Sequence, residues 1–323
     1  MHSERRVSGR DRYLPSSQIR VRYPSNYLPP SRKASPQKRR CYQERGDILS
    51  LVKRHPIITF FVLTYAIAWG LIPFWTFQAG APLIAALIVV PLTQGVAGLK
   101  EFGLRMIRWR VRWYWYVAAI GVPLAVVALT AGLNVALGAS VPSLASYGSI
   151  STVFMVFAIR LVNPGDGALG EEPGWRGFAL PGLQGSGYSP LVSTLILGAL
   201  VTGWHVPLLF LEDGLLRPSI IVGFLLGTMA VTFWYTWLFN HTGGSVLMTL
   251  ISHGVQGTIT IGGLWSVGAD FARANLITGI VLLTVAIGLV VFDRKAWRAP
   301  PAPETTTPSQ TMPHDGAAPA ASA

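Results

Sequence analysis

Eight apolar stretches of about 20 residues dominate this sequence and limit what it can fold into. They fall at residues 57–77, 80–99, 113–137, 151–182, 189–211, 218–239, 244–265 and 273–292. A helical stretch of that length matches the hydrocarbon thickness of a bilayer. The chain of 323 residues is 51% hydrophobic and only 12% charged, whereas soluble domains usually carry about 25% charged residues. The sequence therefore predicts an all-α, polytopic membrane helical bundle with about eight transmembrane helices.

The fourth stretch, residues 151–182, is interrupted near its middle. Its first half ends at the sequence NPGDG, where Asn163, Pro164 and two glycines disfavour a continuous helix. Membrane proteins tolerate such a break only where the exposed backbone faces protein or a watery cavity. We therefore expect the fourth helix to be broken, and the break to mark a functional region.

Polar tails flank the apolar region. Residues 1–55 contain 14 Lys or Arg against 4 Asp or Glu, so they hold most of the formal net charge of +12. A basic segment beside a membrane span is typical of a cytoplasmic tail that contacts anionic lipid headgroups, and no nucleic-acid recognition motif accompanies it. The predicted organisation is a disordered basic tail (1–55), a membrane domain (56–295) and a disordered C-terminal tail (296–323).

Basic residues in the short loops set the expected orientation, because cytoplasmic loops carry an excess of Lys and Arg. Such residues follow the second and the eighth stretch, namely Lys100, Arg105, Arg108, Arg110, Arg112, Arg294, Lys295 and Arg298. The loops on the other side carry Arg217 alone, beside Glu212 and Asp213. We expect both termini to be cytoplasmic.

Few ionisable residues lie inside the apolar stretches, where charged groups are costly and usually functional. They are Arg160, Asp166, Glu171, Glu172, Arg176, His205 and His253. Counted from the cytoplasmic loops, Glu171, His205 and His253 would lie roughly 18, 22 and 14 Å deep at the rise of an α-helix. Provided that their helices are neighbours, one carboxylate and two imidazoles converge near the middle of the bilayer.

The spacing of these residues suggests roles but leaves alternatives open. Glu172 and Arg176 stand at i and i+4, so we expect them to neutralise each other, which leaves Glu171 free to act as a general base. Either histidine alone could instead be a structural hydrogen-bond donor. Arg160 and Asp166 are interpreted as a structural pair.

A metal site is a further alternative. Catalytic zinc needs three protein ligands and one open position, and Glu171, His205 and His253 could supply a divalent ion such as Zn²⁺ with such a set. The sequence has no HExxH pair of the kind in which two ligands share one helix face. An obligatory metal is therefore not predicted.

Three motifs resemble those of the CAAX-processing and bacteriocin-immunity (CPBP, or Abi) family of intramembrane proteases. They are EEPGWRGFALPGL, GWHVPLLF and NHTGGSVLMTLISHG, and they cover a core of about residues 150–260. The resemblance implies an endopeptidase in a membrane, in a bacterial cell membrane by the usual distribution of the family, that acts on a hydrophobic or lipid-modified peptide. It also implies that Glu171 activates the attacking water with help from Glu172, that His205 and His253 complete the site, and that Arg176 is a positioning residue.

One departure from the family pattern bears on activity. The third motif is commonly HxxxN, with the Asn helping to bind the oxyanion, but Gly257 stands four residues after His253. Gln256 is a possible substitute. The alternative function is a catalytically weak or inactive immunity or scaffold protein of the same family. A proton-coupled transporter would also explain carboxylates in a membrane, but it predicts internal repeats, and none is evident.

Overall fold

The computed structural model describes residues 49–211 and 214–298. Within these ranges the chain is helical and contains no β-strand. The predicted tails lie almost wholly outside the described residues, so the tail boundaries and their disorder stay predictions. The described part confirms the all-α fold class.

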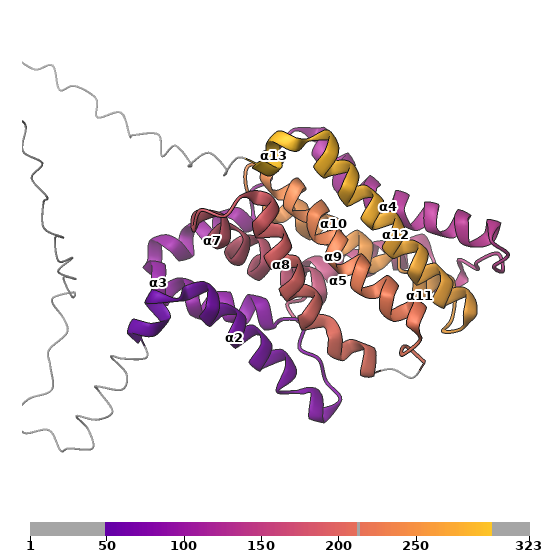
Figure 1. Cartoon of the computed structure of the whole chain (residues 1–323), viewed down its shortest axis with the longest axis horizontal. Helices are drawn as coiled ribbons and strands as arrows, with labels where there is room; N and C mark the ends of the chain where they lie inside the picture. The colour runs from indigo at the N-terminus through magenta and orange to yellow at the C-terminus, as the bar shows by residue number, and fades with distance from the viewer. Residues whose placement is uncertain (1–48, 212–213, 299–323) are drawn as a thin grey trace, which may run out of the picture. The chain divides into compact units, whose positions relative to one another are not determined.

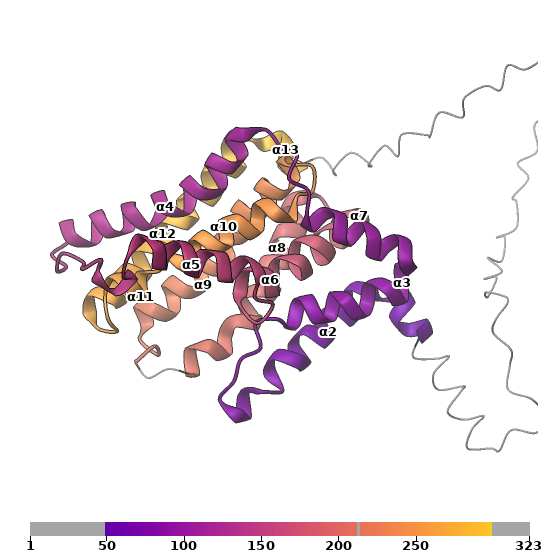
Figure 2. The ribbon, with the colours of Figure 1, turned by 180° about the vertical axis from the view of Figure 1, so that it is seen from behind.

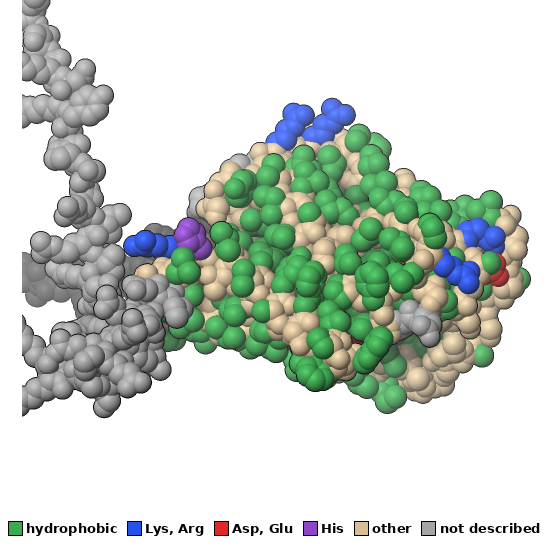
Figure 3. Space-filling view, turned by 60° about the horizontal axis from the view of Figure 1, so that its bottom comes forward, with side chains coloured by type: hydrophobic (Ala, Val, Ile, Leu, Met, Phe, Trp, Pro, Cys, Tyr) green, Lys and Arg blue, Asp and Glu red, His purple; other side chains and the backbone are tan. Residues whose placement is uncertain are grey.

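Six helical segments of the described chain are long and apolar enough to cross a membrane. They comprise α2 (Pro56–Trp69) with the short 3₁₀ helix η1 (Ile72–Phe74), α3 (Ala81–Met106), α4 (Trp113–Ala136), α8 (Pro190–His205) with η4 (Val206–Phe210), α9 (Pro218–His241) and α12 (Ala269–Phe292). Hydrophobic side chains cover most of the face in Figure 3, and Lys and Arg side chains lie toward its margins. Such an exterior is typical of a polytopic membrane bundle.

The fourth predicted stretch is broken as expected. After the 3₁₀ turn η2 (Ala145–Tyr147), α5 (Ile150–Val162) ends at Asn163, whose backbone is extended, and α6 (Gly167–Glu172) begins after Asp166. The Asp166 side chain accepts the Gly167 N–H and so caps α6. The local chemistry of the NPGDG sequence thus produces the predicted break.

A π-helix that the sequence did not predict comes directly after α6. It is η3 (Pro173–Ala179), and α7 (Leu180–Gly185) continues from it. Pro173 has no N–H to donate within the helix, which removes one hydrogen bond of the α-helical ladder. Wide turns of this kind occur frequently at functional sites.

Glycines let α6 and η3 approach α3 and the residues just before it. A Cβ atom added to Gly174 would stand 2.5 Å from the backbone oxygen of Pro82, and one added to Gly170 would stand 2.8 Å from the backbone oxygen of Ala79. The seven residues of η3 are all buried, and Trp175 packs against Phe60 and other aromatic side chains of the core. The segment with the glutamates is therefore held in the interior of the bundle.

The seventh predicted stretch is shorter than a full span. The helix α10 (Val246–Thr258) has 13 residues, and after an extended Ile259 the one-turn α11 (Ile261–Leu264) begins. Ser245 caps the start of α10, and Thr260 caps α11. A short α13 (Arg294–Arg298) lies beyond α12.

The short helix α10 lies at the centre of the bundle. It packs on α4, α5, α6 and α9, and Figures 1 and 2 show it between these helices from opposite sides. The long helices α9 and α12 lie side by side, because Gly223 and Gly279 let their backbones meet closely. This arrangement places the faces of α6, α8, α9 and α10 around one interior space.

Candidate active site

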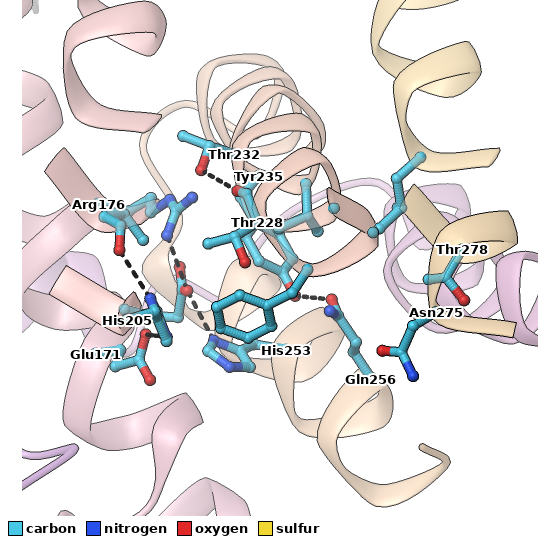
Figure 4. Close-up of a pocket in the computed structure, with 17 residues that line it drawn as sticks. Glu171, Arg176, His205, Thr228, Thr232, Tyr235, His253, Gln256, Asn275 and Thr278 are labelled. Carbon is cyan, nitrogen blue, oxygen red and sulfur yellow. Dashed lines mark hydrogen bonds and ion pairs between the residues drawn. The ribbon is translucent and has the colours of Figure 1, made fainter. Parts of the chain in front are cut away.

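A cavity of about 260 Å³ lies between α6, α8, α9, α10 and α12. Its polar lining includes Glu171, Glu172, Arg176, His205, His253 and Gln256. Figure 4 shows side chains from these separate helices pointing toward one another. The structure thus brings together every residue that the sequence proposed for the site, including Glu171, His205 and His253, whose similar depths the counting of helical residues predicted.

Glu172 is the buried centre of a small network. Its Oε1 accepts a hydrogen bond from Arg176 Nη1 at 3.0 Å and one from His253 Nδ1 at 2.9 Å. The exposed fractions of the Glu172 and Arg176 side chains are 0% and 2%, so the pair is shielded from solvent. The predicted i, i+4 neutralisation is confirmed, and Glu172 in addition fixes the ring of His253.

Glu171 lines the same cavity but has different partners. Trp175 Nε1 donates to Glu171 Oε2 at 3.2 Å, and His205 Nε2 lies 3.7 Å from the same oxygen. The second distance is too long for a hydrogen bond. Glu171 is buried, and among residues 49–211 and 214–298 it has no arginine or lysine partner comparable to Arg176 on Glu172.

Both histidines are anchored through Nδ1, which leaves Nε2 of each ring free of that contact. His205 Nδ1 lies 2.8 Å from the Val201 carbonyl oxygen, and His253 Nδ1 bonds to Glu172. A Cβ atom added to Gly167 would stand 3.1 Å from His253 Nε2 and 3.2 Å from Glu171 Oε1. His205 Nε2 thus lies near Glu171 Oε2, while His253 Nε2 and Glu171 Oε1 both lie beside Gly167.

Tyr235 on α9 braces the site, and the sequence did not single it out. Its ring stacks on that of His253 with centroids 5.6 Å apart, and the Arg176 guanidinium lies 4.8 Å from the centroid of the Tyr235 ring. The Tyr235 hydroxyl donates to Gln256 Oε1 at 2.5 Å. No sequence signal separates Tyr235 from the neighbouring aromatic residues of α9, because only the folded bundle shows which ring faces α10.

Several polar atoms of the site lack a protein partner. Glu172 Oε2 and both Nε and Nη2 of Arg176 are buried without a hydrogen bond in the described part of the chain. Buried polar groups are normally satisfied by protein, water or ligand. The cavity is therefore suited to hold water or polar groups of a bound molecule.

The Arg160–Asp166 pair forms as predicted, with Nη1 and Oδ1 2.5 Å apart. Neither residue lines the cavity. Gly257 does not line it either, whereas Gln256, one position earlier, does.

The alternative of a metal site concerns the same residues. Within residues 49–211 and 214–298, no three His, Cys, Asp or Glu side chains are grouped so that they could hold a metal ion. Glu171, His205 and His253 therefore do not fit a three-ligand site in this geometry, and no catalytic step is derived through a metal.

A second cavity of about 430 Å³ adjoins the first between α4, α9, α10 and α12. Apolar side chains such as Val122, Val126 and Phe271 supply much of its lining. The two cavities share lining residues, among them Phe224, Gln256 and Asn275. An apolar chamber thus opens beside the polar site.

Comparison with known proteins gives two matches. Residues 149–259 match the family model described as Type II CAAX prenyl endopeptidase Rce1-like. The chain is also 28% identical over 179 residues to CAAX prenyl protease 2 of Methanococcus maripaludis, which covers 53% of this chain and 63% of that protein. The chain thus matches less than two thirds of the length of this relative. The matched segment carries every candidate site residue, and over this segment the chain is similar to the Rce1-like members of the CPBP family.

Proposed function

We propose that this protein is an intramembrane endopeptidase in which Glu171 activates a water molecule to hydrolyse a peptide bond. The observation that carries the proposal is the position of Glu171 in a cavity that His205 and His253, on other helices, also line, with His205 Nε2 3.7 Å from Glu171 Oε2. The Rce1-like match over residues 149–259 supports the same activity.

The proposed reaction begins with proton transfer to Glu171. Glu171 takes one proton from a water molecule in the cavity, and the water oxygen attacks the carbonyl carbon of the scissile amide. The carbonyl π electrons move to its oxygen, which becomes an oxyanion. Trp175 holds Glu171 Oε2 through its Nε1, so the carboxylate is oriented before the water binds.

Donors around the cavity would stabilise the oxyanion. When protonated, His205 and His253 each offer an N–H at Nε2, because Nδ1 of each ring is already engaged. The amide of Gln256 accepts from Tyr235 through Oε1, which leaves its NH₂ group to donate. Removal of one oxyanion donor typically slows such reactions by about 10²- to 10³-fold.

The second half of the reaction releases the products. Glu171 gives its proton to the nitrogen of the leaving amine as the C–N bond breaks, and this leaves a carboxyl group on the other fragment. Glu172 keeps its hydrogen bonds to Arg176 and His253. Its part in the mechanism is to hold the histidine ring and to balance the arginine charge.

A hydrophobic or lipid-modified peptide is the substrate class that the surroundings favour. The apolar chamber shares a wall with the polar cavity, so an apolar portion of the substrate could lie there while an amide reaches Glu171. The name of the relative, CAAX prenyl protease 2, points to the same class. We also propose that the segments before α2 and after α12 face the cytoplasm, where basic residues contact anionic headgroups.

The Glu171→Gln variant tests the proposal. In purified protein reconstituted in liposomes, cleavage of a fluorogenic farnesylated peptide ending in a CAAX sequence should fall by about 10²-fold or more, because the general base is lost. Thermal unfolding should stay near that of the wild type. The matched control is Glu101→Gln on α3, whose carboxylate pairs with Arg105 away from the cavity. Equal cleavage by wild type and Glu171→Gln would show that Glu171 is not the general base, whereas no cleavage by the wild type would favour the scaffold alternative.

A further inference from the structure

Arg160 on α5 lies against the backbone of Gly257 on α10, one helical turn beyond His253. A Cβ atom added to Gly257 would stand 3.0 Å from Arg160 Nη1 and 3.2 Å from its Cζ and Nε. Gly254 allows the same close approach, since an added Cβ there would stand 3.1 Å from Phe157 Cε2. The guanidinium therefore fills the space that a side chain at position 257 would enter.

The same guanidinium fixes the start of the helix that carries the glutamates. Arg160 Nη1 donates to Asp166 Oδ1 at 2.5 Å, and this oxygen also accepts the N–H of Gly167 at 2.6 Å. Gly167 is the first residue of α6, and it lies beside both His253 Nε2 and Glu171 Oε1. A displacement of Asp166 would thus move the point where the carboxylate and the imidazole face each other.

Stability alone gives a poor reason for an arginine at this position. Arg160 Nε is buried and has no hydrogen-bond partner among the residues that the structure describes. A buried N–H without a partner lowers the stability of the fold, and the Arg160–Asp166 pair is itself only partly buried, so the ion pair contributes little in return. The contacts of Arg160 with α6 and α10 therefore indicate that it positions these two helices.

We propose that Arg160 is a positioning residue of the active site. Its guanidinium stands in for a side chain at position 257 and, through the Asp166 cap, holds Glu171 opposite Nε2 of His253. The inference rests on the proposed function, and it explains why this chain has glycine at position 257. Arg160 does not touch the substrate.

Reciprocal substitutions in the full-length protein test the proposal. With the farnesylated peptide, Arg160→Ala should lower kcat by about 10- to 100-fold with KM nearly unchanged, because a misplaced catalytic group loses rate rather than binding. Gly257→Asn should also lower kcat, since its side chain collides with the guanidinium. The double variant Arg160→Ala/Gly257→Asn should recover much of the lost kcat, and Arg160→Lys should lie between wild type and Arg160→Ala.

The control is Arg273→Ala, which removes another partly buried arginine from an ion pair, that with Asp270. It should leave kcat unchanged. An Arg160→Ala variant with the kcat of the wild type would overturn the inference, and so would a double variant no faster than either single one. If Arg160→Ala does not fold, Gly257→Asn and Arg160→Lys decide. The inference is then overturned if both variants keep the kcat of the wild type. Failure of the proposed function is distinct, because wild type and Glu171→Gln would then cleave equally.

Discussion

At the scale of single residues, the environment distinguishes two adjacent glutamates. Glu172 is held by Arg176 and His253, whereas the carboxylate of Glu171 accepts a hydrogen bond from the indole of Trp175. The i, i+4 spacing predicted the pairing of Glu172 with Arg176, because that pairing depends only on helix geometry. The role of Trp175 could not be predicted, since an indole in an apolar stretch is equally expected to pack or to anchor at the interface.

The Trp175→Phe variant should lower kcat by about 10-fold and leave KM nearly unchanged. The substitution removes the donor to Glu171 Oε2 but keeps an aromatic ring against Phe60, and a hydrogen bond to a charged group contributes about 1.5–3 kcal/mol. Steady-state kinetics with the farnesylated peptide measure the effect. Trp297→Phe is the matched control, because that buried indole donates to the Leu289 carbonyl, away from the cavity. An unaltered kcat in Trp175→Phe would mean that the indole does not orient the carboxylate.

At the scale of helices, the sequence predicted the break of the fourth span but not the π-helix beyond it. The break depends on local chemistry, namely Pro164 and the capping side chain of Asp166. The π-helix η3 and the short α10 depend on contacts between distant segments, such as Gly174 against Pro82. Hydropathy reports only how apolar a stretch is, so it assigned to α10 the length of a full span.

Gly174→Ala should destabilise the protein by about 1–3 kcal/mol, the usual cost of forcing extra atoms into a packed core. The added Cβ would stand 2.5 Å from the Pro82 backbone oxygen on α3, which cannot move as a side chain does. Chemical or thermal unfolding in detergent measures the loss. Gly103→Ala on α3 should not destabilise, because its added Cβ meets nothing within 4 Å. Equal stability of the Gly174 and Gly103 variants would contradict the close packing of η3 on α3.

At the scale of the whole molecule, the chemistry of the loops fits the proposed orientation, in which the basic loops face the cytoplasm. Just beyond α12, Asp293 accepts a hydrogen bond from Trp237 Nε1 and pairs with His241. The hydrogen bond from Trp237 holds the pKa of Asp293 below its usual range, so the carboxylate is charged at neutral pH. A charged cluster of this kind suits the water-facing end of the bundle, where the basic residues after α3 also lie.

Cysteine labelling can test this orientation. In a Cys41→Ser background, Ser143→Cys between α4 and α5 should react with a membrane-impermeant maleimide added outside intact cells. Ser186→Cys between α7 and α8 should react only after the membrane is permeabilised. Both positions are exposed in the structure, so burial does not account for the expected difference. The reverse pattern of labelling would place the basic loops on the outside.

The lack of a side chain at Gly167 has a consequence for how such chains are compared. The gap between His253 Nε2 and Glu171 Oε1 exists because this residue has a hydrogen where others have a carbon. A relative with Gly167→Ala would keep every acid, base and donor of the site, yet its methyl group would stand 3.1 Å from His253 Nε2 and 3.2 Å from Glu171 Oε1 and crowd the space beside both. An inventory of catalytic side chains is therefore insufficient to identify a working member of the family, because the empty volume between them is part of the active site.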